Sequence, residues 1–324
     1  MTKRQDTGKR RIAFSAVGRI ALMTAVMLSC GQSRDEETDL ARQESERQTR
    51  EDSAALKIAV LPTLDCLPLY VAESHGMFNS LGADIRLKRF AAQMDCDTAL
   101  TRRHVEGAVS DIVRCEKMMR TDSMSLTYVT ATDAYWQLIT NRTARIKEPK
   151  QLDDKMMAMT RFSATDLLGD HVTDDARLDY DRVFRIQIND VNVRLRMVQN
   201  NMIDALWLTE PQAAAARKDK HTVVADSRDI DFRPGVIAVR TELLADTTRK
   251  KQIDILTKAY DMACDTINVY GIHAFDGLIE ECCAADTGVA RTLPDSLPFI
   301  HVHAPRDKDI QTANKWIERK GLTR

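Results

Sequence analysis

Short apolar runs alternate with amphipathic stretches along the chain from residue 56 onward. An apolar run bounded by polar turns is typical of a buried strand, and apolar residues three and four positions apart indicate a helix. In one strand, Ile85 and Leu87 alternate with Arg86 and Lys88. The predicted elements are a strand at 56–61, a helix at 67–75 that ends before Gly76, a strand at 84–90, a helix at 95–104, a strand at 107–109 and a helix from Asp111.

This order of elements predicts an α/β fold in which helical crossovers join parallel strands. Ligands of such sheets bind outside the carboxyl ends of the strands, so the turns 62–66, 92–97 and 110–111 share one sheet edge. Each turn opens a helix, whose first amides have no acceptor within the helix. The acids in these turns, which either cap the helices or line a cleft, are Asp65, Asp95 and Asp111.

The composition is that of an ordinary globular protein. Of the 324 residues, 44% are hydrophobic and 29% are charged, which suffices for one large core or two smaller ones. The formal net charge is −1, but residues 1–29 hold six basic side chains and one acid. Without them the chain carries 41 basic and 47 acidic residues, and this negative surplus argues against nucleic acid as a partner.

The N-terminus has the layout of a secretory signal. A basic region precedes an apolar run at 20–28, which is too short to remain in a bilayer as a spanning helix. The sequence MLSC at 27–30 resembles a bacterial lipobox, in which cleavage leaves an acylated cysteine at the new N-terminus. We therefore expect a lipoprotein signal peptide at 1–29 and lipidation of Cys30. The alternative is an uncleaved anchor or an ordinary signal peptide.

A polar segment follows the predicted anchor. Residues 31–53 contain one large aliphatic side chain and many charges. Ordering such a segment would bury too little apolar surface to offset the lost conformational entropy. The sequence therefore predicts a disordered polar tether at 30–53.

The folded part resembles a known family. It is similar to periplasmic solute-binding proteins of the nitrate, alkanesulfonate, taurine and thiamine-precursor group. The stretches that carry the likeness are 57–90, 97–100 (DTAL), 106–113 (EGAVSDIV), 146–168 and 200–216. The likeness weakens in the last third of the chain. Where the group usually has a glycine before Lys155, this chain has Asp154.

The resemblance implies a two-lobe type II periplasmic binding fold, in which each lobe is a mixed, mostly parallel sheet flanked by helices. The strand-like stretches 135–140 and 236–240 are the expected hinge crossings. Lobe one would then comprise 54–138 and 241–324, and lobe two 139–240. Two short crossings permit the lobes to close around a ligand.

The start of one helix in lobe two is a candidate anion site. Ser163 and Asp166 have the spacing of a capping box at the start of a helix, which would turn the amides of Ala164 and Thr165 toward the cleft. In the resembled family this helix start holds the negative group of the ligand. The alternative is a self-capped helix that binds nothing.

Polar and aromatic residues in the turns are the candidate ligand contacts. The predicted set is Asp65, Cys66, Gln93, Asp95, Ser110, Asp111, Asp133, Tyr135, Arg161, Ser163, Ala164, Thr165 and Glu210, with Trp136, Phe162 and Trp207 as further aromatic candidates. Acids outnumber bases, which favours a cationic or amine-bearing aromatic ligand over nitrate. The alternative is that the acids cap helices or pair with Arg114, Arg142 and Arg161.

Seven cysteines allow disulfides in an exported protein. Cys66 and Cys96 follow neighbouring strands at one sheet edge, so we expect them to lie within bonding distance. Cys264 is expected to pair with Cys282 or Cys283. The alternative is that these side chains are buried free thiols.

The resemblance implies a receptor and no enzyme. We expect a monomeric lipoprotein on the periplasmic side of the cell envelope that captures a small molecule and delivers it to the membrane subunits of an ABC importer. No cofactor is expected. His301 and His303 lie two residues apart without a third ligand at metal-site spacing, so no metal is expected either.

Two other functions remain open. One is an enzyme on the same fold, of the type found in menaquinone and thiamine biosynthesis. The other is a sensor lipoprotein that works without a transporter. Fold alone does not separate the receptor from the sensor.

Overall fold

The computed structural model describes residue 42 and residues 54–322. The predicted signal peptide and Cys30 lie outside the described residues, as does the predicted tether apart from Arg42. The chain divides into two units, Met1–Ala54 and Ala55–Arg324, and the second contains both sheets. None of the described helices combines the length and the apolar character needed to cross a membrane.

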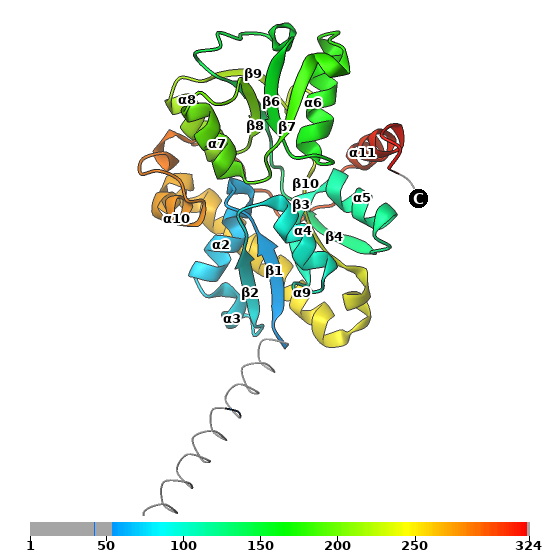
Figure 1. Ribbon diagram of the computed structural model, residues 1–324. Coiled ribbons are helices and arrows are strands. Elements are labelled where there is room, and N and C mark those ends of the chain that lie inside the picture. Colours follow the sequence, from blue (N-terminus) through cyan, green and yellow to red (C-terminus); the bar gives the residue numbers. More distant parts are fainter. Residues whose placement is uncertain (1–41, 43–53, 323–324) are drawn as a thin grey trace, which may run out of the picture. The chain divides into compact units, whose positions relative to one another are not determined.

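Two five-stranded sheets form the folded unit (Figure 1). In spatial order, the strands of the first sheet are β2 (Ile85–Arg89), β1 (Leu56–Val60), β3 (Gly107–Asp111), β10 (Gly235–Arg240) and β4 (Leu126–Ala131). Those of the second sheet are β7 (Val183–Gln187), β6 (Lys155–Met159), β8 (Ala205–Leu208), β5 (Gln137–Thr140) and β9 (Thr222–Asp226). In both sheets the first three strands run parallel, and the fourth is antiparallel to its two neighbours.

Helices flank both sheets. The first lobe is the first sheet with α2 (Leu67–Ser74), α3 (Met77–Ser80), α4 (Gln93–Thr101), α5 (Ile112–Thr121), α9 (Thr247–Tyr270), α10 (Asp276–Cys282) and α11 (Asp307–Arg319). The second lobe is the second sheet with α6 (Ala164–Asp175), α7 (Val191–Gln199) and α8 (Gln212–Lys218). The predicted two-lobe α/β fold is confirmed, because each lobe is a mixed sheet covered by helices (Figure 1).

The chain crosses between the lobes at 132–136 and 227–234. The stretches predicted as crossings, 135–140 and 236–240, are instead largely the strands β5 and β10. All residues of both strands are buried, and a strand inside a sheet has the same apolar pattern as a buried connection. β5 therefore belongs wholly to the second lobe and β10 to the first, a few residues from the predicted boundaries.

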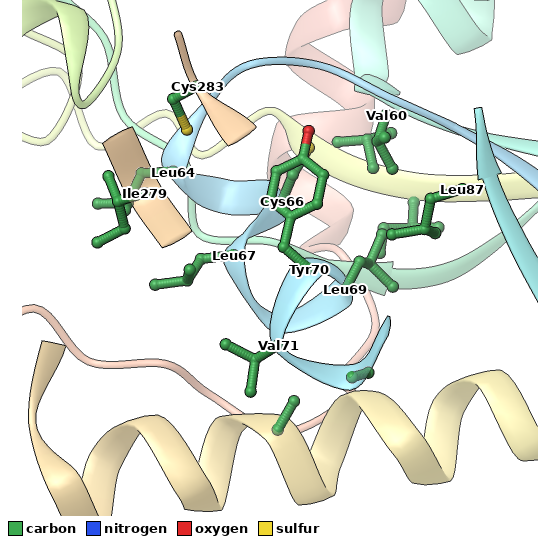
Figure 2. Close-up of a cluster of buried hydrophobic side chains, with 14 of the residues drawn as sticks. Val60, Leu64, Cys66, Leu67, Leu69, Tyr70, Val71, Leu87, Ile279 and Cys283 are labelled. Carbon is green, nitrogen blue, oxygen red and sulfur yellow. The ribbon is translucent and has the colours of Figure 1, made fainter. Parts of the chain in front are cut away.

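Helix α2 anchors the core of the first lobe. Its buried side chains pack between the first sheet and α9, and Ile279 and Cys283 from the α10 region lie beside its first turn (Figure 2). The Tyr70 hydroxyl donates to the carbonyl oxygen of Leu61 at 2.6 Å, just after β1. This bond and the apolar contacts fix the turn that links β1 to α2, where predicted cleft residues lie.

The C-terminal helix contacts both lobes. α11 packs on α5 of the first lobe, and the Trp316 side chain is buried. Its Nε1 donates to a carboxylate oxygen of Asp170 in α6 at 2.7 Å. The Lys320 ammonium lies 2.8 Å from the same carboxylate. α11 thus links the lobes in addition to the two crossings.

The predicted disulfides are not formed, because all six cysteines of the described part of the chain are free thiols. Cys66 and Cys96 follow neighbouring strands, but their side chains pack into the two different core clusters. Those clusters cover opposite faces of the first sheet, as the neighbouring residues Ile58 and Ala59 of β1 show. The Cys264 thiol instead faces the carbonyl oxygen of Ile300 at 3.5 Å.

The two crossings lie so close together that Gly235 has no room for a side chain. A Cβ atom there would lie 2.8 Å from the Cβ atom of Ala134 and closer still to the Thr132 hydroxyl. We expect Gly235→Ala to lower the free energy of unfolding by about 1–3 kcal/mol, as overpacked sites do. Chemical denaturation measures this change.

Gly277 provides the matched control, because it lies in α10 with no atom near the position of an added Cβ. Gly277→Ala should raise the free energy of unfolding by about 0.5–1 kcal/mol through helix propensity. Equal effects at the two glycines would contradict the close packing of the crossings.

Candidate functional site

The ends of six parallel strands surround one small cavity between the lobes, which we call the cleft cavity. Its volume is about 50 Å³. Both lobes contribute, as expected where the carboxyl ends of parallel strands meet. The strand ends supply Asp65 after β1, Gln93 after β2, Ser110 and Asp111 in β3, Ser163 after β6, Asn189 after β7 and Thr209 after β8.

The lobes lie in direct contact around this cavity. The amide of Leu64 in the first lobe donates to the carbonyl oxygen of Glu210 in the second at 2.8 Å. The Gln212 side chain donates to the carbonyl oxygen of Pro62 at 2.7 Å. Arg114 reaches the carbonyl oxygen of Arg161 at 3.3 Å. These contacts involve backbone atoms of both lobes and hold them in a closed arrangement.

Asp111 is both a helix cap and a cleft residue. Its carboxylate accepts the amide of Arg114 at 3.0 Å and caps α5. Burial raises the pKa of Asp111 to about 6, and Arg114 and the backbone amide of Ala164 oppose this rise. The backbone amide of Ala164, which is the first residue of α6, therefore lies close to the Asp111 carboxylate across the cleft. Asp111 therefore has both of the roles that the sequence offered as alternatives: it caps a helix and it lines the cleft.

The start of α6 is largely self-capped. Ser163 Oγ accepts the amide of Thr165 at 3.1 Å and donates to the carbonyl oxygen of Thr160 at 2.7 Å. Asp166 accepts the amide of Phe162 at 2.9 Å, so the reciprocal capping box expected between Ser163 and Asp166 is not formed. Of the two amides predicted to face a ligand, the one of Thr165 is used by the cap.

Asp65 lies at the centre of the site. It is partly buried, accepts a hydrogen bond from the Thr132 hydroxyl at 3.3 Å, and forms no salt bridge with any described residue. Burial raises the pKa of Asp65, and hydrogen bonds from Thr63 and Thr132 oppose the rise. This carboxylate is thus held in the cleft without a cationic partner from the protein.

The sequence interpretation missed Arg194, which lines the cleft cavity from α7. Its side chain is buried, with 6% of the residue exposed. Nη1 donates to the carbonyl oxygen of Trp207 at 2.9 Å, but Nε has no hydrogen-bond partner. Burial lowers the pKa of Arg194 to about 10, and Asp190 opposes this shift.

A signal for Arg194 was present in the sequence. Val191, Leu195 and Val198 are buried on one face of α7, and Arg194 occupies that same face at the i+3 position. An arginine on the buried face of an amphipathic helix requires a polar environment inside the protein. Arg194 lies one turn into α7, so the turns that follow the strands do not include it.

A larger cavity adjoins the first on the side of the crossings, and we call it the hinge-side cavity. Its volume is about 170 Å³, and Asp65 and Thr209 line both cavities. Besides Asp65, three predicted residues are found here. Glu210 accepts the Tyr135 hydroxyl and pairs with Arg217, both at 2.8 Å, and Asp133 lies 3.4 Å from Arg233. These two acids are therefore already paired within the protein.

The remaining predicted residues lie elsewhere. Arg161 lines a third cavity beside the buried ion pair of Arg114 and Asp97. Asp95 is exposed and lines none of these cavities. Cys66 is buried in the core of the first lobe. The structure thus gathers the predicted residues Asp65, Gln93, Ser110, Asp111, Trp136, Ser163 and Thr165 around the cleft cavity and adds Asn189, Arg194 and Thr209.

A family model described as NMT1/THI5 like matches residues 63–266, more than half of the chain. The chain belongs to this NMT1/THI5-like family. The match spans both lobes and includes every residue that lines the cleft cavity except Leu61. No curated protein matches the chain in sequence.

Solved structures share the fold of this NMT1/THI5-like chain at low sequence identity. The alkanesulfonate-binding protein SsuA from Xanthomonas axonopodis pv. citri, bound to MOPS, superposes with a TM-score of 0.71 at 14% identity, covering 84% of this chain and 94% of that one. The periplasmic nitrate-binding protein NrtA from Synechocystis PCC 6803 gives 0.68 at 11% identity, covering 83% and 82%. The desulfurization enzyme DSZB gives 0.57 at 12% identity, covering 83% and 93%.

The raised pKa of Asp111 predicts a pH dependence of stability. The folded protein binds a proton there more tightly than the unfolded chain, whose Asp has a pKa near 3.8. As the pH falls from 7 to 4, the free energy of unfolding should therefore rise by up to about 3 kcal/mol relative to Asp111→Asn. Denaturation of both proteins across this range measures the difference.

Asparagine keeps a capping oxygen at the start of α5, so the variant should fold. Asp95→Asn is the control, because Asp95 is exposed. Parallel pH profiles for the natural protein and Asp111→Asn would show that Asp111 titrates like an ordinary surface carboxyl group.

Proposed function

We propose that this protein is the solute-binding receptor of an ABC importer, which captures a small molecule in the cleft cavity and delivers it unchanged. The observation that supports this most directly is the meeting of six strand ends from two separate lobes around one cavity. Two short crossings allow such lobes to separate and close. Closure removes water from the polar contacts and strengthens them.

Family membership and the structural neighbours support the same proposal. SsuA and NrtA are named as binding proteins for sulfonates and nitrate. Their sequence identity to this chain is too low to transfer the ligand. The residues of the cleft cavity therefore have to identify it.

A panel of ligands tests the receptor. We expect titration calorimetry of the full-length protein to detect about micromolar binding of one compound among thiamine precursors, alkanesulfonates, taurine, nitrate and small amines. The compound should be recovered unchanged. Asp111→Ala should weaken this binding at least about tenfold by removing a buried cleft carboxylate, and the exposed Asp95→Ala should leave it unchanged. If the Asp111→Ala and Asp95→Ala proteins bind the compound with equal affinity, the compound binds outside the cleft cavity.

An enzyme on this fold is the second candidate. The likeness to DSZB and the raised pKa of Asp111 favour it, because a buried carboxyl group with a pKa near neutrality is typical of an acid–base catalyst. Formation of a new product from the bound compound would decide for the enzyme and against the receptor.

We also propose that Cys30 is acylated and anchors the receptor on the periplasmic side of the cell envelope. The lipobox-like sequence at 27–30 supports this. The full-length protein should enter the detergent phase on phase partitioning, because acyl chains bind apolar phases strongly. Cys30→Ser should move it to the aqueous phase. A detergent-phase Cys30→Ser protein would refute the lipid anchor.

A further inference from the structure

The second lobe presents an unpaired positive charge to the cleft cavity. Arg194 is buried, its Nε has no partner, and it forms no salt bridge among the described residues. A guanidinium group offers five N–H donors, and the structure gives it the Trp207 carbonyl oxygen as acceptor. A buried cation without a counter-charge is strongly unfavourable. Its remaining donors are suited to an anionic group that enters the cavity.

The acid nearest to Arg194 along α7 does not neutralise it. The Asp190 carboxylate accepts the amides of Asn192 at 2.8 Å and Val193 at 2.9 Å, and so caps α7. It makes no salt bridge with Arg194 in the described structure. The protein thus leaves the guanidinium group without a carboxylate partner.

The first lobe presents the opposite charge to the same cavity. Asp65 and Asp111 both line it, and neither forms a salt bridge with a described residue. The cation closest in sequence to Asp111 is Arg114, but its guanidinium group is paired with the buried Asp97. These carboxylates are suited to a ligand that brings a positive charge.

Because the two lobes present opposite charges to one cavity, we propose that the cleft binds a zwitterion. The oxyanion of this ligand binds Arg194 of the second lobe, and its ammonium group binds Asp65 and Asp111 of the first lobe. The inference rests on the proposed receptor function. A simple anion would leave the two carboxylates without a partner, and a simple amine would leave Arg194 without one. A ligand with both charges satisfies both lobes and links them when they close.

The cavity sets the size of this ligand. A volume of about 50 Å³ holds a few non-hydrogen atoms, which suits an amino carboxylate or an amino sulfonate with a short carbon chain. A larger substituent has room in the hinge-side cavity, because Asp65 and Thr209 line both spaces. Carboxylate and sulfonate groups share the oxyanion chemistry that Arg194 requires.

Matched ligands of similar size test the proposal in the natural full-length protein. One set is β-alanine, propionate and propylamine, and the other is taurine, ethanesulfonate and ethylamine, each titrated at pH 7 by calorimetry. We expect the zwitterion of at least one set to bind at least about tenfold more tightly than its anion and its amine, because each lacks one buried charge contact. The set that binds identifies the oxyanion.

Variants of Arg194 and Asp65 test which lobe binds each charged group of the ligand. Arg194→Gln should remove the preference for the zwitterion over the amine, and Asp65→Asn should remove the preference over the anion. Arg194→Lys keeps the charge and should retain part of the preference. The exposed pair Arg182 and Asp153, 2.6 Å apart in the same protein, supplies matched controls: Arg182→Gln and Asp153→Asn should leave all affinities unchanged.

Three results would overturn the zwitterion. The first is an anion or an amine that binds as tightly as its matched zwitterion, and the second is an unchanged preference in a folded Arg194→Gln protein. The third is no binding of any of the six compounds. In that third case, a compound from the broader panel that does bind would leave the receptor function standing while the zwitterion fails.

Discussion

The two crossings pack closely against each other where they enter the central antiparallel strands of the sheets. Each sheet contains one antiparallel strand, β10 or β5, and the chain enters these strands directly from the crossings. The segments at 132–136 and 227–234 therefore run beside each other, and Gly235 lies where they are nearest. Because both connections lie together, the lobes can rotate about them, and the strand ends that line the cleft cavity face each other from opposite lobes.

The electrostatics of the cavity differ from the pattern that the family resemblance implies. There, the amides at the start of a helix in lobe two hold the negative group of the ligand. In this chain Ser163 uses one of those amides and Asp111 faces another. The positive charge of the second lobe comes instead from Arg194 on the following helix. In this chain the charged group that the second lobe places at the cleft cavity is thus a side chain, and not only the start of a helix.

The sequence predicted the order of strands and helices well, because the 2.0 and 3.6 residue periods follow directly from side-chain geometry. It also predicted that Asp65, Ser110 and Asp111 share one edge. It did not separate the crossings from β5 and β10, since a buried strand and a buried connection have the same apolar pattern. It wrongly paired Cys66 with Cys96, because proximity along an edge does not fix the face of the sheet on which a side chain lies. Arg194 was not predicted because it lies one turn into α7, outside the turns that hold the predicted residues.

The hydrogen bond between Trp316 and Asp170 joins α11 to the second lobe and resists separation of the lobes. α11 rests on α5, yet its indole nitrogen is bonded to α6 of the other lobe. If the lobes swing apart, either this buried bond breaks or the last helix shifts with α6. α11 therefore holds the two lobes together at a place outside the cleft cavity. Under the proposed receptor function, the residence time of a bound ligand depends in part on Trp316 and Asp170, which do not line the cleft cavity.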